Sequence, residues 1–122
     1  MDRVEQAAQY KRMNNCCQAV LLAYADVLGK TESELCALGK CFGAGMGGMQ
    51  GTCGALVGAE MVLSLTGGNM AQAKVLHQKF TALCGASLCK DIKGVETGKV
   101  LCSCEDCVRN AVKALEELRN GS

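Results

Sequence analysis

The chain has 122 residues and a net charge of +1, which suits one ordinary domain and excludes the basic excess typical of nucleic-acid-binding proteins. Ten cysteines, no proline and only 3% aromatic residues favour closely packed helices over sheets. The weakly charged stretch 41–73 is interrupted by glycines, and its apolar runs are shorter than the about 20 residues that a membrane span needs. We therefore expect it to be buried within the protein and not in a membrane.

Hydrophobic periodicity predicts a single all-α domain over residues 1–122, folded as a bundle of four to five helices. Capping residues and glycines mark the expected helix ends. The predicted helices run over 3–28, from Thr31 to about Gly39, from Thr52 to about Leu65, from Asn69 to about Cys84, and over about 104–119. A glycine-rich loop precedes the third helix, which is apolar almost all round. We expect this helix to be central and to lie against the first.

The ten cysteines are the candidate functional residues. Because the chain starts without an apolar leader, we expect a cytoplasmic protein with reduced thiols. In that setting, clustered cysteines favour metal or redox chemistry over disulfide staples. The only histidine, His77, falls on a polar side of its helix and is expected at the surface, so the sequence predicts no Cys–His pair.

Cys53 is the strongest candidate thiol, because it follows the glycine-rich loop at the start of the third helix. Unpaired backbone N–H groups and the helix dipole stabilise a thiolate at such a position. Cys17 lies on the apolar stripe of the first helix and should point inward, whereas its neighbour Cys16 should be partly exposed. Gly54 and Gly58 offer a smooth strip for close helix packing. The sequence therefore predicts that the Cys17 and Cys53 sulfurs lie within disulfide or shared-metal distance, with Cys89 or Cys104 beside them.

Further cysteines enter the last helix as the run Cys102-Ser103-Cys104-Glu105-Asp106-Cys107. The spacing C-x-x-C at a helix start is typical of redox or metal-ligand cysteines, because one turn brings both sulfurs to one side. No second C-x-x-C completes a zinc ribbon. Upstream, Cys89 precedes Lys90, and a nearby cation lowers a thiol pKa.

Three segments resemble a bacterial family of redox-active proteins named for its C-GCAxxG-C-C cysteine pattern. They are 15–21 (NCCQAVL), 42–47 (FGAGMG) and 52–59 (TCGALVGA). The resemblance continues through Cys89 into the last helix and covers nearly the whole chain. It implies redox activity and four family cysteines, which are Cys17, Cys53, Cys89 and Cys104.

The sequence departs from the family pattern at several cysteines. The central motif here has cysteine before glycine, the reverse of the order in the family name. Cys102 and Cys107 compete with Cys104 for the last position. Four cysteines are additional to the pattern: Cys16, Cys36, Cys41 and Cys84.

Three functions follow from these cysteines as alternatives. In the first, Cys17, Cys53, Cys89 and Cys104 converge to bind an iron–sulfur cluster or another soft metal for electron transfer with a redox partner protein. In the second, Cys53 attacks and Cys17 or Cys89 resolves in a thiol–disulfide couple, with Cys104 and Cys107 as a second pair. In the third, a structural or interaction module uses cysteines only to fill space. The sequence specifies no enzymatic reaction, and a homodimer is one expected assembly.

Overall fold

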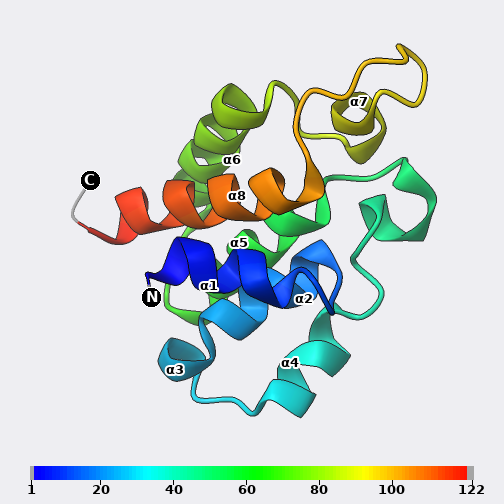
Figure 1. Cartoon of the computed structure of the whole chain (residues 1–122). Helices are drawn as coiled ribbons and strands as arrows, with labels where there is room; N and C mark the ends of the chain where they lie inside the picture. Colours follow the sequence, from blue (N-terminus) through cyan, green and yellow to red (C-terminus); the bar gives the residue numbers. More distant parts are fainter. Residues whose placement is uncertain (1, 121–122) are drawn as a thin grey trace.

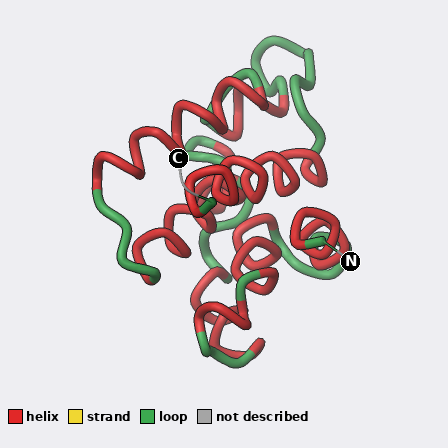
Figure 2. The backbone as a smooth tube through the Cα atoms, turned by 90° about the vertical axis from the view of Figure 1, so that its left-hand side faces the viewer, coloured by secondary structure: helices red, strands yellow, loops and turns green. Residues whose placement is uncertain are grey.

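A computed structural model describes residues 2–120 and contains, within them, nine helices and no strand (Figure 2). The all-α prediction is confirmed, but the count of four to five helices is wrong, since six of the nine have at least seven residues. The helices are α1 (Arg3–Tyr10), α2 (Cys16–Ala23), α3 (Ala25–Leu28), α4 (Glu32–Gly39), η1 (Gly45–Met49), α5 (Gly54–Leu65), α6 (Met70–Cys84), α7 (Cys89–Lys93) and α8 (Cys104–Arg119).

The single helix predicted over 3–28 is wrong, because the chain breaks it at Asn15. Asn15 has an extended backbone and caps α2 through a reciprocal pair of bonds with Gln18. The Asn15 side-chain oxygen accepts from the Gln18 N–H at 2.8 Å, and the Gln18 side-chain oxygen accepts from the Asn15 N–H at 2.9 Å. The Asn15 amide also donates to the carbonyl of Gly39 at 3.2 Å. This capping box satisfies the first N–H groups of α2 and separates it from α1.

The remaining predicted helices are confirmed, with one change at the start of α5. Thr31 and Asn69 are the N-caps of α4 and α6, as expected. Cys53, not Thr52, is the N-cap of α5. Thr52 pairs instead with Leu88 in an isolated antiparallel bridge. This pairing holds the glycine-rich loop against the segment that leads into α7.

Helix α5 is packed between α2 and α8, which confirms its predicted central position (Figure 1). A Cβ atom on Gly54 would lie 2.7 Å from the Phe42 carbonyl oxygen, and one on Gly58 would lie 2.9 Å from the Cys17 carbonyl oxygen. Both contacts are with backbone, which cannot rotate away. The two glycines therefore allow α5 to approach α2 as closely as the sequence predicts.

The amino-terminal helix is fastened to the last helix around Tyr24. The Tyr24 ring is fully buried, its hydroxyl donates to Glu116 at 2.9 Å, and the guanidinium groups of Arg3 and Arg119 lie over the ring. Burial, followed by the Glu116 contact, raises the pKa of Tyr24. None of the described helices is long and apolar enough to cross a membrane.

Candidate redox and metal site

All ten cysteines are free thiols, and eight of them interact with another cysteine. The eight are Cys16, Cys17, Cys53, Cys84, Cys89, Cys102, Cys104 and Cys107. They come from α2, the N-cap of α5, the end of α6, the start of α7, the segment before α8 and the first turn of α8. The other two cysteines have different neighbours. The Cys36 thiol donates to Asn14 at 3.8 Å, and Cys41 is exposed.

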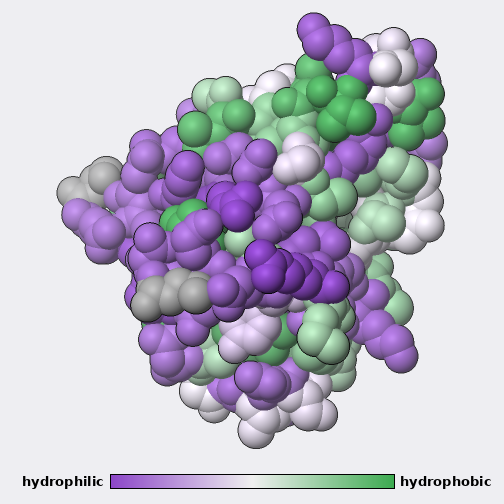
Figure 3. All heavy atoms as spheres, in the orientation of Figure 1, coloured by the Kyte–Doolittle hydropathy of each residue, from purple (hydrophilic) through white to green (hydrophobic). Residues whose placement is uncertain are grey.

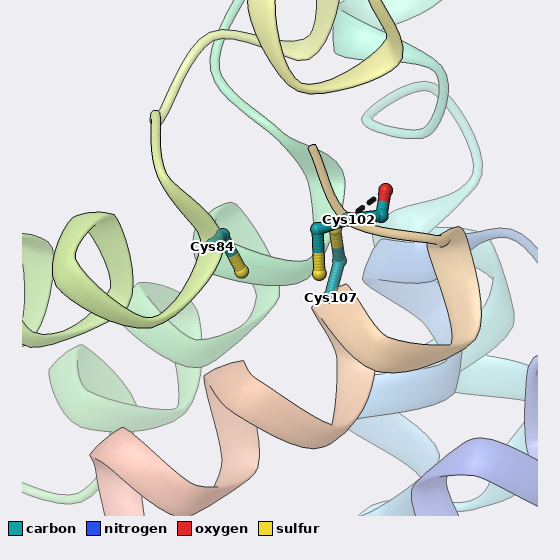
Figure 4. Close-up of side chains that lie close together, drawn as sticks. All are labelled: Cys84, Cys102 and Cys107. Atoms are coloured by element: carbon teal, nitrogen blue, oxygen red, sulfur yellow. Dashed lines mark hydrogen bonds between the residues drawn. The ribbon is translucent and has the colours of Figure 1, made fainter. Parts of the chain in front are cut away.

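The tightest group is a three-cysteine cluster of Cys84, Cys102 and Cys107. Their sulfur atoms all lie within 4.8 Å of one another, and Cys84 and Cys107 are buried. Figure 4 shows the three side chains converging from the end of α6, the segment before α8 and the first turn of α8. The Cys107 thiol also donates to the Cys102 carbonyl at 3.9 Å. Three thiols at this separation are a ligand set for a soft metal.

Asn110 holds two of these sulfurs in position from one turn further along α8. Its side-chain N–H group lies 3.4 Å from the Cys84 sulfur and 3.6 Å from the Cys102 sulfur. Donors to sulfur favour the thiolate and fix its orientation. Cys102 and Cys107 were sequence candidates for the last site position and Cys84 was an additional cysteine, but Asn110 was not anticipated.

Cys53 lies beside the three-cysteine cluster and interacts electrostatically with Cys107. Cys53 is only 3% exposed. The Cys107 contact lowers the pKa of Cys53 to about 7, and the backbone N–H groups of Ala55 and Leu56 add to the effect, against the opposing effect of burial. These N–H groups are the unpaired donors at the start of α5.

Cys84 and Cys53 share Cys107 as their proton-bearing neighbour. The contact with Cys107 lowers the pKa of Cys84 to about 6, and the contact with Asn110 acts in the same direction. The contacts with Cys53 and then Cys84, together with burial, raise the pKa of Cys107. Cys107 therefore keeps its proton beside two thiols whose pKa values are lowered, and a metal ion bound here would displace the Cys107 proton.

A second pair of thiols, Cys16 and Cys104, lies beside the three-cysteine cluster. The Cys16 contact lowers the pKa of Cys104 to about 5, and Lys93 acts in the same direction. The same contact, followed by burial, raises the pKa of Cys16. Cys16 is 8% exposed, so the prediction of a partly exposed residue is wrong. The reason is that α2 is buried almost all round, so that the side of the helix facing away from Cys17 is covered as well.

Lys93, at the end of α7, is the cation between the two groups of thiols. Its ammonium donates to the Cys102 carbonyl at 3.0 Å and to the Cys107 sulfur at 3.9 Å, and its charge acts on Cys104. Lys90, the cation expected to act on Cys89 from its place in the sequence, pairs instead with Glu96 at 3.7 Å. The sequence feature that could have identified Lys93 is its spacing of four residues from Cys89, which places both residues on one face of a helix.

Cys17 and Cys89, two of the predicted ligands, are buried close to Cys53. The Cys17 thiol lies 3.9 Å from the Met61 sulfur, and burial, with a smaller effect of Cys53, raises the pKa of Cys17 to about 12. Cys89 packs against Gly45, where an added Cβ would lie 2.6 Å from the Cys89 Cβ. Burial, with a smaller effect of Cys53, also raises the pKa of Cys89. The joint site of Cys17, Cys53, Cys89 and Cys104 stays a prediction.

Residues 14–118, most of the chain, match the model of a family described as "Putative redox-active protein (C_GCAxxG_C_C)". The chain belongs to this family. The resemblance seen in the cysteine and glycine motifs is thereby confirmed. Neither the curated proteins nor the solved structures contain a significant match. The family is described as redox-active, and thiols are groups of this chain that can carry such chemistry.

Selective alkylation provides a direct check of the thiol arrangement. At pH 6, iodoacetamide should label Cys104 much faster than Cys102, since a pKa of about 5 leaves about nine tenths of Cys104 as thiolate. Burial and the charge of Cys84 raise the pKa of Cys102 to about 11, so it stays protonated. Both cysteines are partly exposed and share one tryptic peptide, so fragment-ion mass spectrometry compares them directly. Equal labelling of the two would contradict the arrangement.

Proposed function

We propose that this protein is a small electron-transfer protein that holds a redox-active soft metal centre in its cysteine cluster. The observation that carries the proposal is the mutual approach of the Cys84, Cys102 and Cys107 sulfurs to within 4.8 Å. We assign Cys53 as the fourth ligand because it is buried beside the cluster and interacts electrostatically with Cys107. Cys53 is the one residue that this ligand set has in common with the set predicted from the sequence.

The sulfur spacing suits a single ion bound by four thiolates. Four sulfurs at about 2.3 Å from a central ion are separated from one another by about 3.8 Å. The sulfurs of Cys84, Cys102 and Cys107 already lie within 4.8 Å of one another, and Cys53 would have to join them as the fourth ligand. Electron transfer requires an ion that changes oxidation state, which zinc does not do. Iron, alone or as an iron–sulfur cluster, combines thiolate ligation with redox activity.

The surroundings of the cluster support thiolate ligation. The Lys93 ammonium and the Asn110 amide offer positive charge and N–H donors to sulfurs that would carry negative charge. Hydrogen bonds to the sulfurs and partial burial are the features that tune the reduction potential of such centres.

The surface above the cluster suits contact with a partner protein. Leu83 and Leu101, which precede Cys84 and Cys102 in the chain, are 47% and 46% exposed. Figure 3 shows apolar atoms gathered at the top of the molecule, over the region of α6 and α7. A partner protein bound at Leu83 and Leu101 would contact the residues next to two proposed ligands, Cys84 and Cys102. An exposed apolar surface is typical of protein–protein interaction sites.

Anaerobic reconstitution tests the metal centre. The reduced protein is incubated with ferrous iron, with and without sulfide, and then desalted and assayed for iron, acid-labile sulfide and thiolate-to-iron absorption. We expect a coloured protein with stoichiometric iron; iron without labile sulfide identifies a mononuclear site, and equal iron and sulfide identify a cluster. A colourless protein without stoichiometric metal would overturn the proposal.

The thiol–disulfide alternative draws on one observation, the contact of a low-pKa thiol with a protonated one at Cys53 and Cys107. It would gain support from a metal-free protein that forms a specific bridge from Cys53 under mild oxidation. Mass mapping of the oxidised, desalted protein distinguishes it from the metal proposal. In that mechanism, Cys53 is the attacking thiol, as predicted from the sequence.

A further inference from the structure

An open groove of about 400 Å³ lies between α4 and α5, apart from the cysteine cluster. One residue of α4 and five of α5 line it, and four of the six are apolar: Leu38, Val57, Glu60, Met61, Ser64 and Leu65. The apolar lining reaches the end of α5, where Leu65 is 50% exposed. An exposed apolar surface of this kind is typical of a protein–protein interaction site.

Glu60 is the one charged residue among those that line the groove. Within residues 2–120 it forms no ion pair. Burial raises the pKa of Glu60, and the charge of His77 on α6 acts in the opposite direction. A positive charge close to a half-buried carboxylate stabilises its ionised form. The groove therefore fits an occupant that combines an apolar side chain with a cation.

The neighbouring helix α6 carries such a surface. A short turn joins α5 to α6, so Met70, the first residue of α6, follows closely on the groove residue Leu65. Met70 is 84% exposed, and Lys74 is exposed one helical turn further on. Met70, Lys74 and His77 have the spacing i, i+4, i+7, so they share one face of α6. This face includes the residue whose charge acts on Glu60.

We propose that a second copy of this chain occupies the groove, in a symmetric dimer in which Met70 enters the partner's groove and Lys74 pairs with the partner's Glu60. One side of each copy supplies both the groove and its occupant, so a twofold axis forms both contacts twice. The dimer buries the exposed apolar surface of Leu65 and Met70 and gives the half-buried carboxylate an opposite charge. None of these residues is a proposed metal ligand, so the dimer does not depend on the metal centre.

Sedimentation equilibrium of the full-length protein over a range of concentrations tests the dimer. A reducing agent keeps the exposed Cys41 from cross-linking two chains. We expect a mass twice that of one chain. Met70→Asp should weaken the dimer at least about 10-fold, because it brings a carboxylate towards Glu60. The matched control, Met13→Asp, changes another exposed methionine outside the groove and should leave the dimer unchanged. A monomer at every concentration would overturn the proposal.

Exchange of the two charges tests how the two copies are aligned. Glu60→Lys and Lys74→Glu should each weaken the dimer at least about 10-fold, because each places like charges opposite each other. The variant with both substitutions should restore the dimer, since the opposite charges meet again. Circular dichroism checks that each variant is folded. A dimer that neither single substitution weakens, or that the double substitution fails to restore, would refute the pairing and with it the proposed interface.

Discussion

Replacing Gly54 by alanine should lower the free energy of unfolding by about 2–3 kcal/mol, because the new methyl group would overlap the backbone between α5 and the glycine-rich loop. The added Cβ would lie 2.7 Å from the Phe42 carbonyl oxygen and 3.3 Å from the Cys17 nitrogen. Backbone atoms cannot rotate away, so α5 or the loop has to shift. The same shift would displace Cys53, the neighbouring residue and N-cap of α5. Urea unfolding followed by circular dichroism measures the change.

Gly48→Ala is the matched control for this substitution. Gly48 lies in the same glycine-rich region, and a Cβ there would meet nothing within 4 Å. We expect its free energy of unfolding to change by no more than about 0.5 kcal/mol. Equal losses for the two variants would show that close packing at Gly54 is not what the fold requires.

Replacing Cys107 by serine should weaken iron binding by at least about 100-fold, because Cys107 is the thiol that contacts both Cys53 and Cys84. Its sulfur is also part of the group that lies within 4.8 Å. A hydroxyl is a poor ligand for a soft metal, so the remaining three thiols would hold the ion weakly. Iron per chain after anaerobic reconstitution and desalting measures the effect.

Cys41→Ser is the matched control. This substitution also removes one of the ten thiols, but Cys41 is exposed and is not a proposed ligand. It should bind iron like the unchanged protein. Cys17→Ser and Cys89→Ser decide between the two ligand sets, because only the set predicted from the sequence contains them. Full iron occupancy in Cys107→Ser would exclude the three-cysteine cluster as the metal site.

Helix capping is the part of the fold that the sequence predicts best. The pairs Thr31 with Glu34 and Asn69 with Gln72 form their bonds within three residues, so the spacing alone reveals them. Asn15 and Gln18 have the same spacing, yet the apolar periodicity on both sides of them favoured one continuous helix. The short-range bond decides here because it satisfies N–H groups that a break would otherwise leave unpaired.

By itself, the sequence determined that this is an all-α chain of a redox-active cysteine family with a close-packed helix after a glycine-rich loop. It also pointed to a functional thiol at Cys53. These features depend on composition, on local hydrogen bonds and on residue size, and all three can be inferred from one amino-acid sequence. The grouping of the thiols depends on contacts between residues far apart in the chain. The approach of Cys84 to Cys107, the pairing of Cys16 with Cys104 and the place of Lys93 between them were decided only when α2, α5, α6, α7 and α8 packed together.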